Sequence, residues 1–489
     1  MSTVRERSNG EEETLHDGSG SEGGTKKRPG PRQVSLFAPE LAEERWGFFK
    51  SWAWMLFLVT IAMFAFLPIY WGAYFRQAQN LYRLTVGLID LDTPGATAMG
   101  RTAVVGPSLL AASAQLPGHH LGFVQLDSSA YDISNVTGAE PRGINVYDWA
   151  EKAVVNEDYF GIIIANPNAT VAAVNAYEQL AGGAQSVLYE GSGALTMYYV
   201  EGRNFETEDQ WVAPGMTSLI NRQVVGDAGS ALVAQLSPRL GGLTQAQYSA
   251  INQTALSSVL SRPFSYSQWN LRPIDQFAAI PATSVGMLYL LIFTYFVSLF
   301  WNNARMAVQL EQKLRLKDLV ILRLTVPVFQ YIFISLWISL VTLAFHVSFN
   351  RWWGHGGFPL FWASNFLCQW ALGMYMEIAL SLLGPKYTAF FLIFWVITNV
   401  SVAFIDLADM DHFYSYGFIM PVFQAVQVGK SIIFGTKSRM GQYFGINIAW
   451  AFVGSLLLAA TTVFKRKQEI KKKEQEEMQE KEKKGQGDT

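Results

Sequence analysis

The chain has 489 residues, of which 50% are hydrophobic, 14% aromatic and only 16% charged. Soluble domains carry about a quarter charged residues, so this composition is typical of a membrane protein. The net charge of −2 gives no support for nucleic-acid binding, and the single cysteine, Cys368, excludes an intrachain disulfide and a multi-cysteine metal site. With only six scattered histidines, we expect neither a dedicated metal centre nor a cofactor.

Residues 1–50 are rich in Gly, Ser, Glu and Lys and poor in apolar side chains, which predicts a disordered tail. A charge-free apolar run follows at 52–70 and is long enough for a helix to cross the hydrocarbon core. The run begins too late and is too long for a signal peptide. We therefore expect a permanent membrane helix over 52–71, with Tyr70 and Trp71 as interfacial anchors.

The segment 72–277 has about 200 residues, enough for one domain with its own core. Strand-like stretches flanked by turn residues mix with helical patterns, so the domain is predicted to be α/β or α+β. The predicted strands are 85–91, 122–126, 160–165, 186–189 and 195–200, and the predicted helices include 171–180 and 217–236.

Five further runs of spanning length lie within 278–464, before a densely charged tail at 465–489. They are 278–301, 324–345, 358–383, 387–405 and 444–464. Each run predicts a helix, because backbone amides in hydrocarbon must be hydrogen-bonded within their own segment. The expected fold class is therefore a mainly α-helical membrane protein, with six transmembrane helices and a large extracytoplasmic domain between the first and the second.

Basic residues give the predicted orientation of these helices. The loop 302–323 is basic, and the tail 465–489 begins with two Lys/Arg triplets. Since basic flanks favour the cytoplasmic side, we expect both termini to be cytoplasmic. The basic start of the tail is also a candidate contact for anionic lipids.

One apolar segment, 413–435, does not fit this scheme easily. It contains Gly417, Pro421, Gly429 and Lys430, and a seventh span there would place the basic tail outside. We favour a re-entrant or interfacial helical segment, with a seventh span as the alternative.

The familiar catalytic motifs of hydrolases, metalloproteases and dinucleotide enzymes are missing from the sequence, so we do not expect an enzyme. One acidic group follows the fifth predicted span: Asp406, Asp409, Asp411 and His412. Three carboxylates within six residues have the chemistry for a cation, but acidic caps at a helix terminus are the simpler interpretation.

Glu377 is the most suggestive single residue, because a carboxylate inside a membrane helix is costly and usually faces the bundle interior. Three interpretations stay open: a proton-coupling or substrate-contacting group, a hydrogen-bond partner that pins two helices together, or a partly wet group near the interface. Asn399 and Gln369, with Ser381 as a further candidate, are expected to converge with Glu377 on a substrate or proton path.

Four Asn-x-Ser/Thr sequons occur in the chain. Asn135, Asn168 and Asn252 fall in the predicted extracytoplasmic domain and are candidate glycosylation sites. Asn399 falls inside the fifth predicted helix, where a glycosyltransferase has no access.

Several short motifs occur in a distinctive order: Asn399-Val400-Ser401, then Phe413-Tyr414-Ser415-Tyr416-Gly417-Phe418 with Pro421, then Ile433-Phe434-Gly435-Thr436-Lys437. Over residues 52–464 this pattern resembles the fungal nitrosoguanidine-resistance membrane protein family, which is related to the membrane part of ABC-exporter-type permeases. Phe413, Tyr414, Tyr416, Gly417 and Pro421 suit a re-entrant hairpin, because Gly and Pro break the helix and Tyr anchors at the interface.

The resemblance implies resistance to nitrosoguanidine-type compounds and carries no catalytic residues over to this chain. Our leading hypothesis is a permease-like protein that exports, or helps to export, amphipathic compounds or lipids. The alternative is a non-transporting membrane protein that organises lipids or regulates other transporters. Expected partners are membrane lipids, a small amphipathic substrate and a homodimer or a partner transporter. We expect the plasma membrane rather than an internal membrane.

Overall fold

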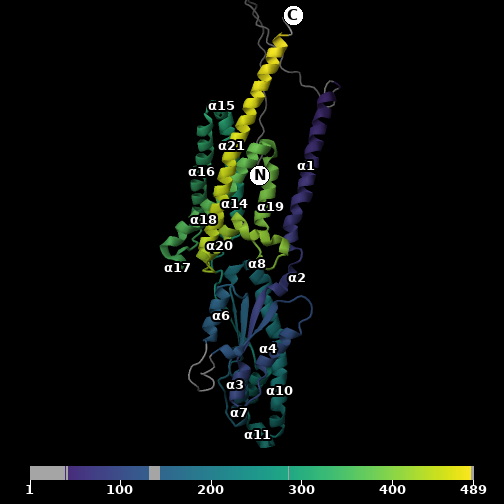
Figure 1. Ribbon diagram of the computed structural model, residues 1–489. Helices are drawn as coiled ribbons and strands as arrows, with labels where there is room; N and C mark the ends of the chain where they lie inside the picture. Colours follow the sequence, from purple (N-terminus) through teal and green to yellow (C-terminus); the bar gives the residue numbers. More distant parts are fainter. Residues whose placement is uncertain (1–38, 40–41, 132–143, 285, 486–489) are drawn as a thin grey trace, which may run out of the picture. The chain divides into compact units, whose positions relative to one another are not determined.

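The computed structural model describes residues 39, 42–131, 144–284 and 286–485 (Figure 1). Most of the predicted tail 1–50 and the last residues of 465–489 lie outside these ranges. The chain divides after Ile61 into two compact units, Met1–Ile61 and Ala62–Thr489. Helix α1 (Ala42–Tyr74) contributes to both, and all later elements belong to the second unit.

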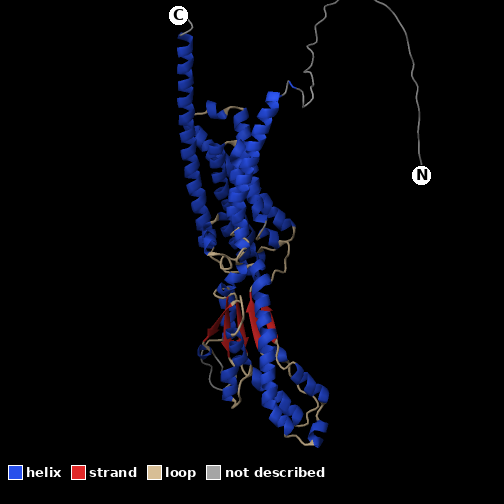
Figure 2. Cartoon of the chain, turned by 90° about the vertical axis from the view of Figure 1, so that its right-hand side faces the viewer, coloured by secondary structure: helices blue, strands red, loops and turns tan. Residues whose placement is uncertain are grey.

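A five-stranded mixed sheet forms the centre of the predicted extracytoplasmic domain (Figure 2). Its strands are β1 (Thr85–Asp90), β2 (Gly122–Leu126), β3 (Gly161–Ala165), β4 (Leu195–Tyr199) and β5 (Tyr266–Asn270). Their order is β2-β1-β3-β4-β5, with β3 and β4 antiparallel and the other neighbours parallel. The prediction of strands mixed with helices in this domain is confirmed.

Two strand assignments differ from the prediction. Residues 186–189 form no strand, and β5 was not predicted. The sequence of β5 is Tyr-Ser-Gln-Trp-Asn, and the strand lies at the edge of the sheet with intermediate and exposed side chains. A half-exposed edge strand lacks the apolar run that marks a buried strand such as β3, whose five residues Gly-Ile-Ile-Ile-Ala are all buried.

Helices cover both faces of the sheet, and successive residues of β3 show how. Ile162 and Ile164 pack with α6 (Val146–Val155), whereas Ile163 packs on the opposite face with α7 (Ala169–Ala181). This alternation is the two-residue period of a strand. The second face is also covered by α4 (Val105–Ala114), α9 (Ala213–Leu219) and α10 (Val225–Gly241).

The predicted helices 171–180 and 217–236 correspond to α7 and to a run that continues from α9 into α10. That run contains two π-helical segments, η6 (Glu208–Val212) before α9 and η7 (Ile220–Val224) after it. The remaining elements of the domain are α2 (Gln77–Asn80), η2 (Leu81–Arg83), α3 (Asp92–Ala98), η3 (Ser128–Ala130), η4 (Gly191–Gly193), η5 (Glu201–Arg203), α8 (Phe205–Thr207), α11 (Gln245–Ala250) and α12 (Gln253–Ser261).

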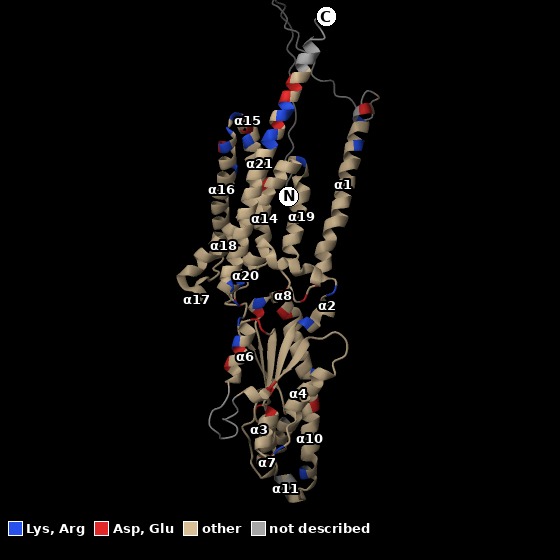
Figure 3. Cartoon of the chain, viewed as in Figure 1, with Lys and Arg blue, Asp and Glu red and all other residues tan. Residues whose placement is uncertain are grey.

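Five helices of the described residues are long and apolar enough to cross a membrane. They are α1, α14 (Gly286–Ala307), α16 (Leu316–Ala344), α18 (Gly357–Leu383) and α21 (Met440–Gly485), and Figure 3 shows the long uncharged stretches in them. Short helices α13 (Ala279–Ala282), α15 (Leu310–Lys313), α17 (Asn350–Trp353) and η8 (Gly354–Gly356) connect the bundle. The charged segment after 464 continues α21 without a break.

The predicted span at 387–405 becomes α19 (Pro385–Val400), which has only 16 residues. A helix that crosses the hydrocarbon core needs about 20 residues, so α19 falls short of that length. The hydroxyl of Ser401 and the amide of Asn399 both bond carbonyls four residues earlier, and the chain then turns. Among the described helices, five are therefore long enough to span the membrane, and α19, the sixth predicted span, is too short.

The segment 413–435 forms two short helices rather than one long one. They are the 3₁₀-helix η9 (His412–Ile419) and α20 (Pro421–Ile433). Pro421 starts α20, where its missing N–H has no helical partner to lose. With 13 residues, α20 is shorter than a span, and its side chains are buried along most of its length against α17, α18 and α21.

Candidate functional site

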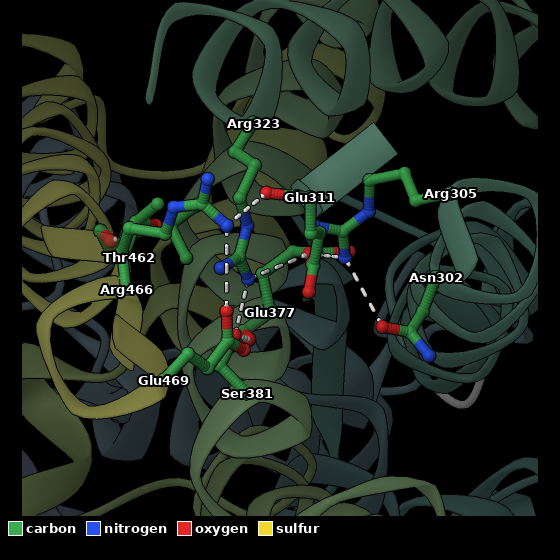
Figure 4. A network of polar contacts seen from close by, with 10 residues as sticks. Asn302, Arg305, Glu311, Arg323, Glu377, Ser381, Thr462, Arg466 and Glu469 are labelled. Atoms are coloured by element: carbon green, nitrogen blue, oxygen red, sulfur yellow. Dashed lines mark hydrogen bonds and ion pairs between the residues drawn. The ribbon is translucent and has the colours of Figure 1, made fainter. Parts of the chain in front are cut away.

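Glu377 lies in α18 and is fully buried. Its Oε2 atom is 3.5 Å from Nη2 of Arg305 in α14 and 3.7 Å from Nη2 of Arg323 in α16 (Figure 4). Both guanidinium groups are almost fully buried as well. One carboxylate therefore joins three membrane helices through their side chains.

The network extends to two further elements and is balanced in charge. Arg305 Nη1 binds Glu311 Oε1 of α15 at 3.1 Å, and Arg466 of α21 donates to the backbone oxygen of Glu311 at 2.6 Å (Figure 4). The Ser381 hydroxyl accepts from Arg323 and donates to the backbone oxygen of Glu377. Arg466 in turn lies 3.8 Å from Glu469, so three arginines face three carboxylates and the charges of the network cancel.

The sequence points to Glu377 but not to its two arginine partners, because both arginines belong to the basic flanks of the predicted spans. A usable signal was present. A lone carboxylate inside a membrane helix needs a cation or donor, and Arg305 and Arg323 each lie close to the end of an uncharged run.

Gln369 shares one face of α18 with Glu377, because the two residues are eight positions apart. Gln369 is fully buried, and neither its amide nitrogen nor its amide oxygen has a hydrogen-bond partner among the described residues. Asn365 is one turn earlier on the same face and is also buried, with an unpaired oxygen, although its nitrogen donates to Ser339 at 2.9 Å. α18 thus carries a row of buried polar side chains toward its neighbours.

The facing helices supply more polar groups to this region. The phenol of Tyr331 in α16 lies against Gly373 of α18, which has no room for a Cβ. The hydroxyl of Ser298 in α14 lies near both Tyr331 and Glu377. The Ser298 hydroxyl interacts with both of these groups, and neither hydroxyl has a well-aligned hydrogen bond within the described part of the chain. We call the set Asn365, Gln369, Glu377, Tyr331 and Ser298 the polar row.

Asn399 does not belong to the polar row. Its side-chain nitrogen donates to the carbonyl of Trp395 at 3.0 Å, and its oxygen accepts from the amide of Val422 at 3.5 Å. It therefore joins the end of α19 to the beginning of α20. Of the three predicted path residues, the structure brings Glu377 and Gln369 to one face of α18 and places Asn399 at another contact.

The predicted re-entrant motif ties helix α1 to the segment before α20. Tyr414 donates its hydroxyl to the carbonyl of Ile69 at 2.7 Å, and Gly72 leaves room for that hydroxyl. Phe413 packs on Tyr414 and Tyr416, with ring centroids 5.1 and 5.8 Å away. Gly417 is pressed against two apolar side chains, Val402 and Leu407.

The acidic group after α19 is distributed over separate contacts. Asp411 caps η9, as the simpler interpretation expected, whereas Asp406 pairs with Arg203 of the sheet domain at 3.2 Å. Asp409 is buried, and both of its carboxylate oxygens lack a partner among the described residues. No group of three His, Cys, Asp or Glu in the described ranges is arranged to hold a metal ion.

Two buried carboxyls near the Asp406–Arg203 ion pair, Asp409 and Glu208, have raised pKa values. Burial, with the neighbouring charge of Asp406 as the next cause, raises the pKa of Asp409 to about 7. Burial likewise raises the pKa of the fully enclosed Glu208 carboxyl in η6 well above its usual range, against the opposing effect of Arg203. Both side chains are therefore easier to protonate than an ordinary carboxyl.

The sheet domain contacts the loops of the membrane helices through several polar bonds. Asn204 donates to the carbonyl of Phe404 at 2.9 Å, and Arg272 donates to the carbonyl of Gly435 at 3.1 Å. Arg272 also lies 4.2 Å above the ring of Trp352. A cavity of about 50 Å³ between these contacts is lined by Glu206 and Lys430 among other residues.

The sequons remain candidate glycosylation sites. Asn168 precedes α7 and has a left-handed backbone conformation. Thr170, the third residue of this sequon, is buried, and its hydroxyl donates to Asp92. Asn252 caps α12, and its side-chain nitrogen donates to the carbonyl of Gln185 at 2.9 Å. Asn135 lies outside the described residues.

Five apolar helices of spanning length, a buried and paired intramembrane carboxylate and an attached mixed-sheet domain define a multi-pass membrane protein. Residues 55–456 match the family model described as "Protein of unknown function (DUF3533)", and the chain belongs to this family. It is 26% identical over 444 residues to an uncharacterized endoplasmic reticulum membrane protein of Saccharomyces cerevisiae, covering 88% of this chain and 83% of the yeast protein. No solved structure matches the chain.

Proposed function

We propose that this protein is permease-like and moves amphipathic molecules, either lipids or lipid-like toxic compounds, across its membrane without chemical catalysis of its own. The polar row is the observation that carries the proposal. Its members Gln369, Tyr331 and Ser298 are buried between apolar helices. Gln369 has no hydrogen-bond partner among the described residues, and the Ser298 hydroxyl interacts only with Tyr331 and Glu377 of the same row.

Buried polar groups are almost always hydrogen-bonded, because leaving one unpaired costs roughly 1–3 kcal/mol. Buried polar groups on facing sides of α14, α16 and α18, with unpaired atoms of Gln369 and Asn365 among them, therefore fit a route that admits water or a polar head group in another state of the bundle. An amphipathic substrate suits such a route, since its polar part needs partners that lipid tails do not supply.

In this proposal Glu377 closes one end of the polar row. Its pairs with Arg305 and Arg323 hold α14, α16 and α18 together at the end of the bundle next to Glu311 and Arg466. Substrate passage requires these helices to separate, and the ion pairs are the contacts that separation would break.

Nitrosoguanidine-type compounds are one substrate class for this route, and the sequence resemblance described above supports them. The yeast relative is a protein of the endoplasmic reticulum membrane, so we propose that membrane for this chain in place of the plasma membrane expected from sequence. Net export against a gradient would require a partner transporter or an ion gradient.

The alternative is a non-transporting protein that organises lipids or regulates transporters. The charge balance of the Glu377 network favours this alternative, because ion pairs that hold helices together permanently inside a membrane are stable only when their charges cancel. The two functions differ in what the purified protein does alone.

Reconstitution into liposomes tests the proposal. We expect the protein to accelerate transbilayer movement of a fluorescent phospholipid analogue, or release of trapped labelled nitrosoguanidine, and Gln369→Leu to reduce that rate. Thr461→Val is the matched control, because the Thr461 hydroxyl bonds a carbonyl of its own helix on an exposed surface. Liposomes with wild-type protein that behave like empty ones for both substrates would refute transport and favour the alternative.

A further inference from the structure

The sheet domain contains a second candidate site, well separated in sequence from the polar row. A pocket of about 420 Å³ lies between the segment that leads into β2 and the helical run around α9. Pockets that bind small molecules have volumes of roughly 300–1,000 Å³. The size is therefore that of a ligand site rather than of a packing defect.

The two π-helical segments build one wall of this pocket. η6 contributes Gln210 and Trp211, and η7 contributes Arg222 and Gln223. A π turn adds one residue to a helical turn and so redirects the side chains around it, and such turns are frequent at functional sites. Two of them, on either side of one seven-residue helix, direct four polar or aromatic side chains toward the same space.

The lining of the pocket combines apolar and polar groups. Leu116, Leu121 and Phe123 contribute apolar surface. The indole nitrogen of Trp211 and the side-chain oxygen of Gln223 are buried, and neither has a hydrogen-bond partner among the described residues. Both atoms are enclosed in the wall of the pocket, so an occupant reaches them only if the side chains turn.

The lining of the pocket includes one cationic side chain, Arg222. Arg222 is exposed, and its guanidinium makes no ion pair or hydrogen bond to any described residue. His119 and His120 also line the pocket, and the His120 ring stacks on Phe123 with centroids 6.4 Å apart. A free arginine beside apolar side chains such as Leu121 and Phe123 is suited to an oxyanion attached to an apolar chain.

The place of the pocket in the chain adds to this argument. Leu81, which also lines it, is seven residues beyond Tyr74, the last residue of the membrane helix α1. The pocket is therefore built partly from the segment that leaves the membrane, where single-chain amphipaths concentrate.

We infer that this pocket binds a single-chain amphipathic anion, with its carboxylate or phosphate head at Arg222 and its chain along Leu121 and Phe123. The site does not depend on the proposed transport route. It assigns to the sheet domain a ligand of the chemical class of fatty acids and lysophospholipids.

Histidine footprinting on the full-length protein in nanodiscs tests this inference. The probes are decanoate and octyl phosphate, with decanol as the uncharged control, and the readout is modification of histidines by diethyl pyrocarbonate. We expect the anions to protect His119 and His120, and to leave the exposed His346 and His355 reactive. Protection by only one of the two anions identifies the head group, carboxylate or phosphate.

Two variants locate the binding. Ser218→Trp fills the pocket and should abolish protection, and Arg222→Gln should weaken anion binding by about ten-fold, as expected for a lost charge-assisted bond. Arg262→Gln, an exposed arginine of the same domain outside the pocket, should bind like wild type. Unchanged histidine reactivity in the wild type with both anions would overturn the inference, and so would equal protection by decanol. The wild-type footprint gives this answer even if Ser218→Trp does not fold.

Discussion

The guanidinium of Arg203 lies 3.4 Å above the ring of Phe160 while its Nε atom binds Oδ2 of Asp406 at 3.2 Å. Phe160 directly precedes the central strand β3, and Asp406 follows the short helix α19. One side chain thus fastens the core of the sheet domain to a loop of the membrane bundle. Both partners of the ion pair are mostly buried, so its geometry is held by packing as well as by charge.

Arg203→Met should therefore weaken this fastening. The substitution leaves Asp406 without its cation in a mostly buried place, and breaking such a pair costs about 3 kcal/mol. We expect a lower melting temperature of the purified protein and faster proteolysis between the sheet domain and α20. Arg239→Met is the control, because Arg239 is half-exposed and pairs with a partly exposed Glu178. Equal effects of the two substitutions would contradict the special role of Arg203.

The Glu377 network gives a second prediction. Glu377→Gln leaves two buried arginines facing each other with only Glu311 to balance them, and should destabilise the bundle by about 3–5 kcal/mol. Arg323→Gln in the same chain should restore part of that loss, because it removes one of the uncompensated charges. Thermal unfolding in detergent measures both variants, with the exposed Glu476→Gln as control. Strictly additive losses would show that the charges do not interact.

The raised pKa of Asp409 predicts that the stability of the folded protein depends on pH. Its pKa is raised from an ordinary value of 3.8 to about 7, so the folded protein binds a proton there that the unfolded chain has lost. Its contribution to stability is full below about pH 4 and is lost as pH rises through 7. We therefore expect the melting temperature to fall between pH 5 and pH 8, with Glu208 acting in the same direction.

Asp409→Asn should remove part of this pH dependence and stabilise the protein at pH 8 by up to about 4 kcal/mol, since the amide stays uncharged. Asp227→Asn, at an exposed position of α10, should leave the pH profile unchanged. A wild-type melting temperature that rises from pH 5 to pH 8 would contradict the assignment.

The close contact between Gly373 and the Tyr331 ring predicts that a larger residue at position 373 destabilises the bundle. A Cβ there would lie under 3 Å from atoms of the buried Tyr331 ring, so Gly373→Ala should destabilise the protein by about 1–3 kcal/mol. Tyr331→Leu in the same chain should relieve the clash. Gly445→Ala is the matched control in α21, where no atom lies near the added methyl group, and it should stabilise the helix by roughly 0.5–1 kcal/mol. A neutral Gly373→Ala would show that α16 and α18 are loosely packed here.

The long apolar elements could be predicted from sequence, because a run of about 20 uncharged residues has few alternatives to a membrane helix. Prediction failed where the signal was short or depended on a distant residue. β5 is a polar edge strand, and α19 ends at Val400 although its apolar run continues. The site shows the same limit: Glu377 was found by its cost in a membrane, but its partner Arg305 is 72 positions away and looked like an ordinary basic flank.

Helix α21 has 46 residues and, at 1.5 Å per residue, is roughly 70 Å long. A bilayer with its head groups is about 40–45 Å thick, so a continuous rod extends well past the membrane. Arg466 joins this rod to Glu311, and Glu311 is bound to the Arg305 that holds Glu377. A partner that binds the protruding end of α21 and tilts it would displace Arg466. The first contacts to be strained would be the ion pairs that hold the membrane helices together.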